Sequence, residues 1–148
     1  MKAVVQRVLD AQLKVDGKII SQIGFGYVIF LGVMKGDTQA EADYMIKKIP
    51  PLRIFEDENG KINKSILDVG GEILLVSQFT LAADTSHGNR PSFIEAEVPD
   101  VANQTYLYVA EGLKKAGVPV KLGVFGADMK INQTNDGPFT VILEKSAQ

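Results

Sequence analysis

The chain has 148 residues, of which 45% are hydrophobic, and its formal net charge at pH 7 is −2. This length predicts one domain, over residues 1–148, with a core of its own. A charge so close to neutral argues against a dedicated nucleic-acid binder with a broad basic face. It leaves open a contact with the end of an RNA, which needs only a few local cations.

The sequence contains no cysteine, which excludes a disulfide framework, a thiolate nucleophile and a sulfur-ligated zinc site. Arg7 and Asp10 interrupt the N-terminal apolar residues before an export signal could form. No apolar run reaches the roughly 18 residues of a membrane span. These features predict a soluble cytoplasmic protein, and with a single histidine no metal or organic cofactor is expected.

The first part of the chain is predicted to form three strands. In residues 2–15, apolar side chains alternate with polar ones toward the end of the run, as in a strand with one buried face. The pair Asp16-Gly17 is a strong signal for a two-residue hairpin, so residues 18–23 should return alongside the first strand. Residues 25–33 form a nearly continuous apolar run, which favours a buried strand.

A helix should follow these strands. Thr38 and Glu41 have the spacing of a capping box, and Pro50-Pro51 should end the helix that they open. Four apolar side chains fall on one face of this helix, which predicts that the face packs against a core: Ala42, Met45, Ile46 and Ile49.

Asn59-Gly60 predicts a tight turn between strands at about 53–55 and 61–63. The acidic run 56–58 resembles a metal-binding cluster only in composition. Because it precedes the turn, it is most simply the solvated tip of a hairpin. The pairs Gly24–Gly26 and Gly70-Gly71 lack both phosphate-loop patterns, and turn glycines are the simpler interpretation.

The second half combines a strand, a polar loop, a long helix and further strands. The apolar run 73–76 predicts a buried strand, which we expect to extend over residues 73–81, and residues 83–90 are predicted to form a loop. Pro99 fits the first turn of a helix, and Gly117 suits its C′ position. The apolar face of this helix comprises Ala102, Tyr106, Val109, Ala110 and Leu113. The last strands are expected at about 119–125, 128–134 and 138–145. This order predicts an α/β fold, a layered mixed β-sheet domain (β/β/α) with two main helices on one sheet face.

Two kinds of side-chain nucleophile need consideration. Ser77, Asp84 and His87 supply the residue types of a hydrolase triad, but no Gly-x-Ser-x-Gly elbow surrounds the serine, and His87 lies in a polar turn. Thr80 could attack only with a neighbouring base, and the sequence indicates none. The simpler interpretation is that the Ser77 and Thr80 hydroxyls bond to backbone groups at the end of a strand.

Two separated segments carry a specific resemblance. Ser77-Gln78-Phe79-Thr80-Leu81 resembles the SQFTL motif of the bacterial and eukaryotic D-aminoacyl-tRNA deacylase family, and Asn135-Asp136-Gly137-Pro138-Phe139-Thr140 resembles its NxGPxT motif. The similarity runs over nearly the whole chain, including 6–8, 53–55, 82–85, 90–93 and 126–129. Three departures are Phe139 in place of a frequent valine, Ile62 in place of a common methionine, and Ser86-His87 in place of a more basic pair.

This resemblance implies hydrolysis of the ester that links a D-amino acid to tRNA, with further activity on mischarged glycyl-tRNA, as proofreading in translation. It implies a homodimer, in which a cis Gly137–Pro138 bond enters the partner's pocket and excludes an L side chain. It also implies that backbone amides and the 2′-hydroxyl of the tRNA do the chemistry. The implied catalytic residues are Ser77, Gln78, Phe79 and Thr80. The residues implied in substrate binding and chiral selection are Gly137, Pro138, Asn135 and Met129.

Two alternatives remain. The first is a hydrolase that uses Thr80 or Ser77 as its nucleophile. The second is a non-catalytic module that binds the acceptor end of tRNA, which the near-neutral charge disfavours.

Overall fold

A computed structural model describes residues 1–147. One mixed sheet dominates it, with the strand order β2-β1-β3-β6-β7 and with β8 paired to the other side of β1. The strands of this sheet are β1 (Lys2–Val15), β2 (Lys18–Ile23), β3 (Gly26–Gly32), β6 (Glu72–Ser77), β7 (Val120–Leu122) and β8 (Lys130–Glu144). The pairs β3–β6 and β6–β7 are parallel, and β1 is antiparallel to each of its neighbours.

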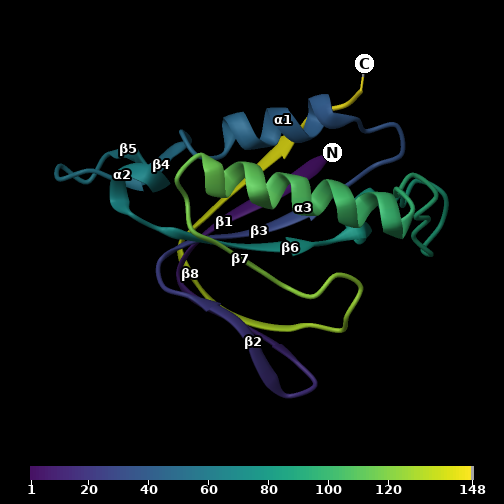
Figure 1. The fold of residues 1–148 in the computed structure, drawn as a ribbon, viewed down its shortest axis with the longest axis horizontal. Helices are drawn as coiled ribbons and strands as arrows, with labels where there is room; N and C mark the ends of the chain where they lie inside the picture. Colours follow the sequence, from purple (N-terminus) through teal and green to yellow (C-terminus); the bar gives the residue numbers. More distant parts are fainter. Residues whose placement is uncertain (148) are drawn as a thin grey trace.

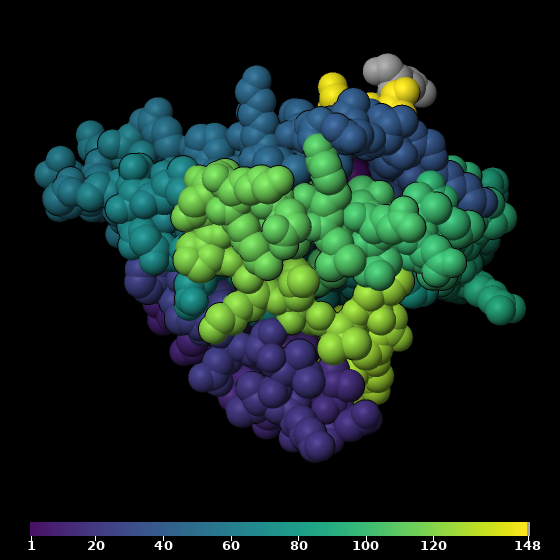
Figure 2. Space-filling model, viewed as in Figure 1, coloured from purple at the N-terminus to yellow at the C-terminus, as the bar shows by residue number. Residues whose placement is uncertain are grey.

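Two long helices lie side by side over one face of the sheet, as the order of the elements predicted (Figure 1). They are α1 (Gln39–Lys48) and α3 (Pro99–Lys115). In the space-filling view the two helices form one continuous surface, and the β1–β2 hairpin projects below them (Figure 2). A mixed α/β fold with a layered sheet is therefore confirmed.

Local signals place most of these elements. Asp16 and Gly17 both have positive φ values, 50° and 79°, which the two-residue turn between β1 and β2 requires. The capping box of α1 is formed as expected, with the Thr38 hydroxyl accepting a hydrogen bond from the Ala40 amide at 3.2 Å. Gly117, with φ 101°, follows the end of α3.

The sheet separates two apolar clusters. The larger lies between the sheet and the helices, and fully buried members include Tyr27, Ile29, Met45, Ile73 and Leu113. The smaller lies on the opposite face, where the long β1 curls toward β2; it contains Val8, Ala11, Leu13, Ile23, Val28, Leu74 and Val76. The continuous burial of β3 and β6 explains why their sequences are almost uniformly apolar.

Three sequence predictions need correction. The strand expected at 73–81 ends at Ser77, and a 3-10 helix, η1 (Phe79–Ala82), follows it. The strands expected at 128–134 and 138–145 are a single strand, β8, because β1 pairs with it on both sides of a bulge at 136–139. The strand expected at 119–125 is only the short β7.

A small hairpin stands beside the main sheet. It consists of β4 (Arg53–Glu56) and β5 (Ile62–Ser65), and a short helix, α2 (Ile66–Val69), follows at once. The Asp57 carboxylate accepts the amides of Asn59 and Lys61 at 2.9 and 3.0 Å, so the acidic run is a hairpin tip, as predicted. No helix within residues 1–147 is long and apolar enough to cross a bilayer.

Candidate active site

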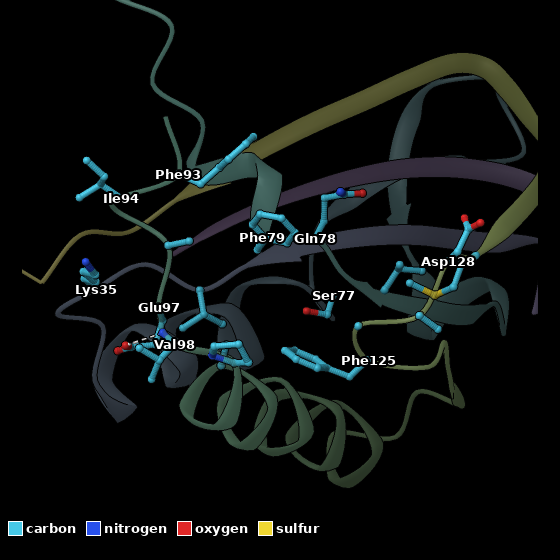
Figure 3. A pocket seen from close by; sticks show the side chains of 18 of the residues that line it. Lys35, Ser77, Gln78, Phe79, Phe93, Ile94, Glu97, Val98, Phe125 and Asp128 are labelled. Atoms are coloured by element: carbon cyan, nitrogen blue, oxygen red, sulfur yellow. Dashed lines mark hydrogen bonds between the residues drawn. The ribbon is translucent and has the colours of Figure 1, made fainter. Parts of the chain in front are cut away.

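A cavity of about 680 Å³ opens where β6 ends, between the start of α3 and the loop that precedes β8 (Figure 3). Its volume is in the range typical of small-molecule sites. The side chains that line it come from four separate stretches of chain: 33–35, 76–79, 93–102 and 125–131. They are mostly apolar, with a few polar groups at the edges.

The end of β6 forms one wall of this cavity, and Gly32 on β3 makes that wall possible. A Cβ at position 32 would lie 2.9 Å from the Leu81 Cβ and 3.1 Å from the Gln78 carbonyl oxygen. Because the glycine leaves this space empty, the turn after β6 packs directly on β3. The Gln78 amide donates to the Leu31 carbonyl at 2.8 Å, which extends the strand pairing by one bond and fixes where the turn begins.

The four residues implied in catalysis are divided between two surfaces. Ser77, Gln78 and Phe79 line the cavity. Thr80 lies outside it, in a shallow groove beside Gln6 and Phe30, and Gln78 borders both surfaces. The Gln78 side-chain amide donates a hydrogen bond to the Thr80 hydroxyl, which ties the two surfaces together.

Two aromatic side chains form the upper rim of the cavity. Phe79 and Phe93 meet edge to face, with ring centroids 5.3 Å apart and planes inclined at 70° (Figure 3). Phe79 remains 55% exposed although it is large and apolar. An exposed aromatic pair at the mouth of a cavity is typical of a surface that a ligand covers.

The opposite wall depends on Gly123 and on a buried tyrosine. A Cβ at position 123 would lie 2.7 Å from the Met129 sulfur, so the glycine leaves the room that the Met129 side chain occupies. Tyr106 lies behind the lining residue Phe125, with ring centroids 6.3 Å apart; its hydroxyl donates to the Leu75 carbonyl at 2.6 Å, and burial raises the pKa of Tyr106 to about 12. Tyr106 is therefore a neutral hydrogen-bond donor at physiological pH.

The bulge in β8 carries the other predicted residues. The Gly137–Pro138 bond is cis, as the resemblance implied, and Gly137 has a φ of 119°. Gly137 and Pro138 are exposed and do not line the cavity of their own chain. Asn135 lies beside them, and its side-chain oxygen accepts a hydrogen bond from Gln133 at 2.7 Å. Of the four residues implied in selection, only Met129 belongs to the cavity wall.

The side chains of the possible triad are not joined in residues 1–147. The Asp84 carboxylate accepts hydrogen bonds from the Ser86 amide and hydroxyl, at 2.9 and 2.6 Å, and these hold the pKa of Asp84 below its usual range. His87 is exposed in the following loop, whereas Ser77 lines the cavity. The same described residues contain no group of three or more His, Asp or Glu side chains arranged to hold a metal ion.

Comparison with known proteins identifies the family. The family model described as D-Tyr-tRNA(Tyr) deacylase matches residues 4–144. This chain belongs to that deacylase family. A Syntrophomonas wolfei protein named D-aminoacyl-tRNA deacylase is 51% identical over 144 residues, covering 97% of each chain. A Persephonella marina protein with the same name is 52% identical over 147 residues, covering 99% of each.

Two solved structures have the same fold as this chain. One titled c-Myc DNA Unwinding Element Binding Protein superposes with a TM-score of 0.94 at 47% identity, covering 99% of this chain and 100% of the other. Another, titled as a probable eukaryotic D-amino acid tRNA deacylase, has a TM-score of 0.77 at 17% identity, over 96% and 97% of the two chains. At that low identity, the second likeness concerns the fold alone.

Several cavity residues were not singled out from the sequence. They include Lys35, Ile94, Val98 and Phe125. Each lies in a loop or at the edge of an element, where neither strand nor helix periodicity marks it. Apolar residues within the mostly polar stretch 83–98, such as Ile94, were the one available signal in the sequence, and Ile94 is indeed exposed.

Proposed function

We propose that this protein is a D-aminoacyl-tRNA deacylase. It hydrolyses the ester that joins a D-amino acid to the terminal ribose of tRNA, and releases the free amino acid and the tRNA. The observation that carries the proposal is the position of the motif Ser77–Leu81, whose first three residues line the cavity. The chain that bears this motif matches the family model over residues 4–144.

The proposed chemistry needs no nucleophile from the protein. A water oxygen attacks the ester carbonyl carbon, the bond from that carbon to the ribose oxygen breaks, and the ribose oxygen takes a proton. The neighbouring 2′-hydroxyl of the terminal ribose assists the water. Amides of the protein hold the carbonyl oxygen as it becomes negatively charged, which stabilises the transition state without any titrating group.

Phe79 and Thr80 are our candidates for these amides. They are the first two residues of η1, and the first amides of a helix have no acceptor inside that helix. The Phe79 donor is therefore available at the cavity, and the Thr80 donor follows it on the side of the adjoining groove. Holding the ester there supplies proximity as well as charge stabilisation.

We propose that a homodimer completes the site. The Gly137–Pro138 segment is exposed on the edge strand β8 and lies outside the cavity of its own chain, so it can act only in the cavity of a second copy. In that position its carbonyl groups occupy the space that an L side chain would need. A pocket that selects in this way accepts every D side chain, and it also accepts glycine, so glycyl-tRNA is a further proposed substrate.

Rates on matched D- and L-tyrosyl-tRNA, with glycyl-tRNA as a third substrate, test this proposal. We expect rapid hydrolysis of the D-tyrosyl and glycyl esters, with the L ester spared. Equal rates on the D and L esters would contradict chiral selection. Binding of tRNA without hydrolysis would instead favour the non-catalytic module.

Single alanine substitutions separate the proposed chemistry from that of a side-chain nucleophile. Thr80→Ala and Ser77→Ala should each keep substantial activity if amides and the 2′-hydroxyl act. A trapped ester between the amino acid and either hydroxyl would overturn the mechanism and establish the alternative hydrolase.

A further inference from the structure

The cavity has two chemically different ends. Lys35, Glu97 and Val98 lie at one end, and Asp128 lies at the other, with Ser77 between them (Figure 3). Met129, the next residue after Asp128, also lines the cavity. A substrate with an anionic part and a cationic part is therefore expected to bind in only one direction.

Lys35 is the only cationic side chain that lines this cavity in residues 1–147. It is exposed, and none of the ion pairs within the described chain uses it. Neither of the two lining carboxylates forms an ion pair with Lys35 in the described residues. Glu97 accepts the Val98 amide at 2.8 Å at the start of α3, and Asp128 pairs with Lys130 at 2.9 Å.

The backbone of Lys35 is held firmly at the rim. Its amide donates to the Glu95 carbonyl at 2.8 Å, and the Glu97 amide donates to the Val33 carbonyl at 3.0 Å. Between these two bonds, Met34 and Ala96 form an isolated antiparallel bridge. The long side chain of Lys35 therefore extends from a fixed backbone position. The hydrogen bonds that fix this position join residues 33–35 to the segment that contains Ile94.

We propose that the Lys35 ammonium binds the phosphate that precedes the terminal nucleoside of the tRNA. The proposal rests on the function proposed above, and it identifies where the acceptor strand enters. That phosphate is the nearest anion to the reacting ester, whereas the α-ammonium of the aminoacyl group is a cation. Both charges favour the same direction, with the nucleotide at the Lys35 end and the aminoacyl group toward Met129.

The size of the effect follows from the exposure of Lys35. An exposed ion pair contributes about 0.2–1 kcal/mol, so its loss should reduce affinity by up to about fivefold. A lysine that neutralises one phosphate of a single strand also contributes roughly 0.7 to the slope of log affinity against log salt concentration. Both quantities can be measured without knowing the structure of the complex.

A comparison of two substrates tests the role of Lys35. One is D-tyrosyl-tRNA, and the other is D-tyrosyl-adenosine, which carries the same ester but no phosphate. Lys35→Gln should lower kcat/KM on the tRNA substrate about two- to fivefold, through KM, and should leave the adenosine ester unchanged. The salt dependence of KM on tRNA should become shallower, and Lys35→Arg should retain most of the activity.

Lys130→Gln is the matched control, since Lys130 is an exposed cation at the other end of the cavity and does not line it. It should leave kcat/KM unchanged on both substrates. The proposal is overturned if Lys35→Gln has no effect on the tRNA substrate, or if it affects both substrates equally. If the wild-type protein hydrolyses neither ester, the proposed function itself fails, and this proposal fails with it.

Discussion

Arg7 on β1 holds Asp136 at the start of the β8 bulge. The Arg7 Nε atom lies 3.3 Å from both the backbone oxygen and the Oδ2 atom of Asp136. The same guanidinium donates through Nη1 to the Ile54 carbonyl at 2.8 Å, and lies 5.0 Å from the centre of the Phe139 ring. One buried side chain thus connects β1, β4 and the bulge that carries Gly137 and Pro138.

Replacing Arg7 should therefore disturb the bulge and the fold together. Arg7→Lys keeps the charge but cannot reach Asp136 and Ile54 at once, because lysine lacks the planar fork of arginine. We expect a loss of about 1–3 kcal/mol in the free energy of unfolding, from a buried carbonyl left without a donor. We also expect weaker discrimination between D- and L-aminoacyl-tRNA.

Urea denaturation and the ratio of D to L rates measure these two effects. Arg53→Lys is the control, because within residues 1–147 the Arg53 side chain bonds only to Asn63, at the exposed surface. An Arg7→Lys protein with unchanged stability and unchanged discrimination would contradict the role of Arg7 in positioning the bulge.

Gly137→Ala should impair selection more than stability. Gly137 has a φ of 119°, which L residues rarely adopt, and an added Cβ would lie 3.1 Å from the Phe139 amide nitrogen and 3.3 Å from the Arg7 guanidinium. The bulge would have to shift at the surface while the core remains packed. The expected result is a lower ratio of D to L rates with a small change in Tm.

Gly88→Ala provides the matched comparison for this substitution. Gly88 also has a positive φ, 83°, but an added Cβ there would meet no atom within 4 Å. The Gly88→Ala substitution therefore introduces backbone strain without any new contact near the bulge. Equal losses of discrimination in the two variants would show that the contacts of Gly137 are not the cause.

The capping box of α1 should make stability depend on pH. The Glu41 carboxylate accepts from the Thr38 hydroxyl and amide, at 2.7 and 2.6 Å, and these hydrogen bonds hold the pKa of Glu41 below its usual range. A carboxyl with a lowered pKa stabilises the fold above its unfolded value of about 4.3, and this contribution is lost as the pH falls through the folded value.

Glu41→Gln should therefore reduce the free energy of unfolding at pH 7. It should also make this free energy fall less steeply as the pH decreases below about 4.3. Urea midpoints between neutral and acidic pH measure both. Glu111→Gln is the control, since Glu111 is an exposed glutamate that pairs with Lys114 on α3 and with no other side chain of the described residues. If the free energy of unfolding of Glu41→Gln falls as steeply with decreasing pH as that of the wild type, the capping box is not the source of this fall.

The contact between α1 and α3 depends on a glycine in the middle of α3. A Cβ at Gly112 would lie 2.3 Å from the Ile46 Cδ1 atom and 2.9 Å from its Cγ2 atom. Gly112→Ala would gain about 1 kcal/mol in helix propensity, but overpacking in a tight interface costs about 1–3 kcal/mol, so a net loss of stability is expected.

A second substitution tests that explanation. Ile46→Ala alone should destabilise the protein by removing a packed side chain, and in the double variant the alanine at 112 should no longer clash. A double-mutant cycle should therefore give a favourable coupling between the two sites. Simple additivity of the two losses would contradict a direct clash.

Several elements could be predicted because their signals are local. Asp16-Gly17 specifies the first hairpin, Thr38 and Glu41 begin α1, and Pro99 and Gly117 bracket α3. The short helix α2 was missed although Ser65 and Asp68 form a second capping box. Four residues of helix offer too little periodicity to detect, so only the cap could have predicted it.

The candidate site was predictable only in part. The motif at 77–81 identified Ser77, Gln78 and Phe79 at the cavity, but not that Thr80 faces a separate groove. That division follows from the end of β6 at Ser77 and from the 3-10 turn that begins at Phe79. The alternation of polar and apolar residues in 78–81 is compatible with a continuing strand, so the sequence conceals this change of direction.

By itself, the sequence determined the family, the hairpins and the two long helices, because these depend on motifs, turn residues and caps that lie close together along the chain. Only the tertiary structure decided that β8 is one strand and that Arg7 lies behind its bulge, since the pairing with β1 joins residues that are more than a hundred positions apart. The same is true of Lys35, whose place at the cavity depends on pairing between residues 33–35 and 95–97. No local pattern encodes such contacts, because they form only when burial of the shared core brings distant segments together.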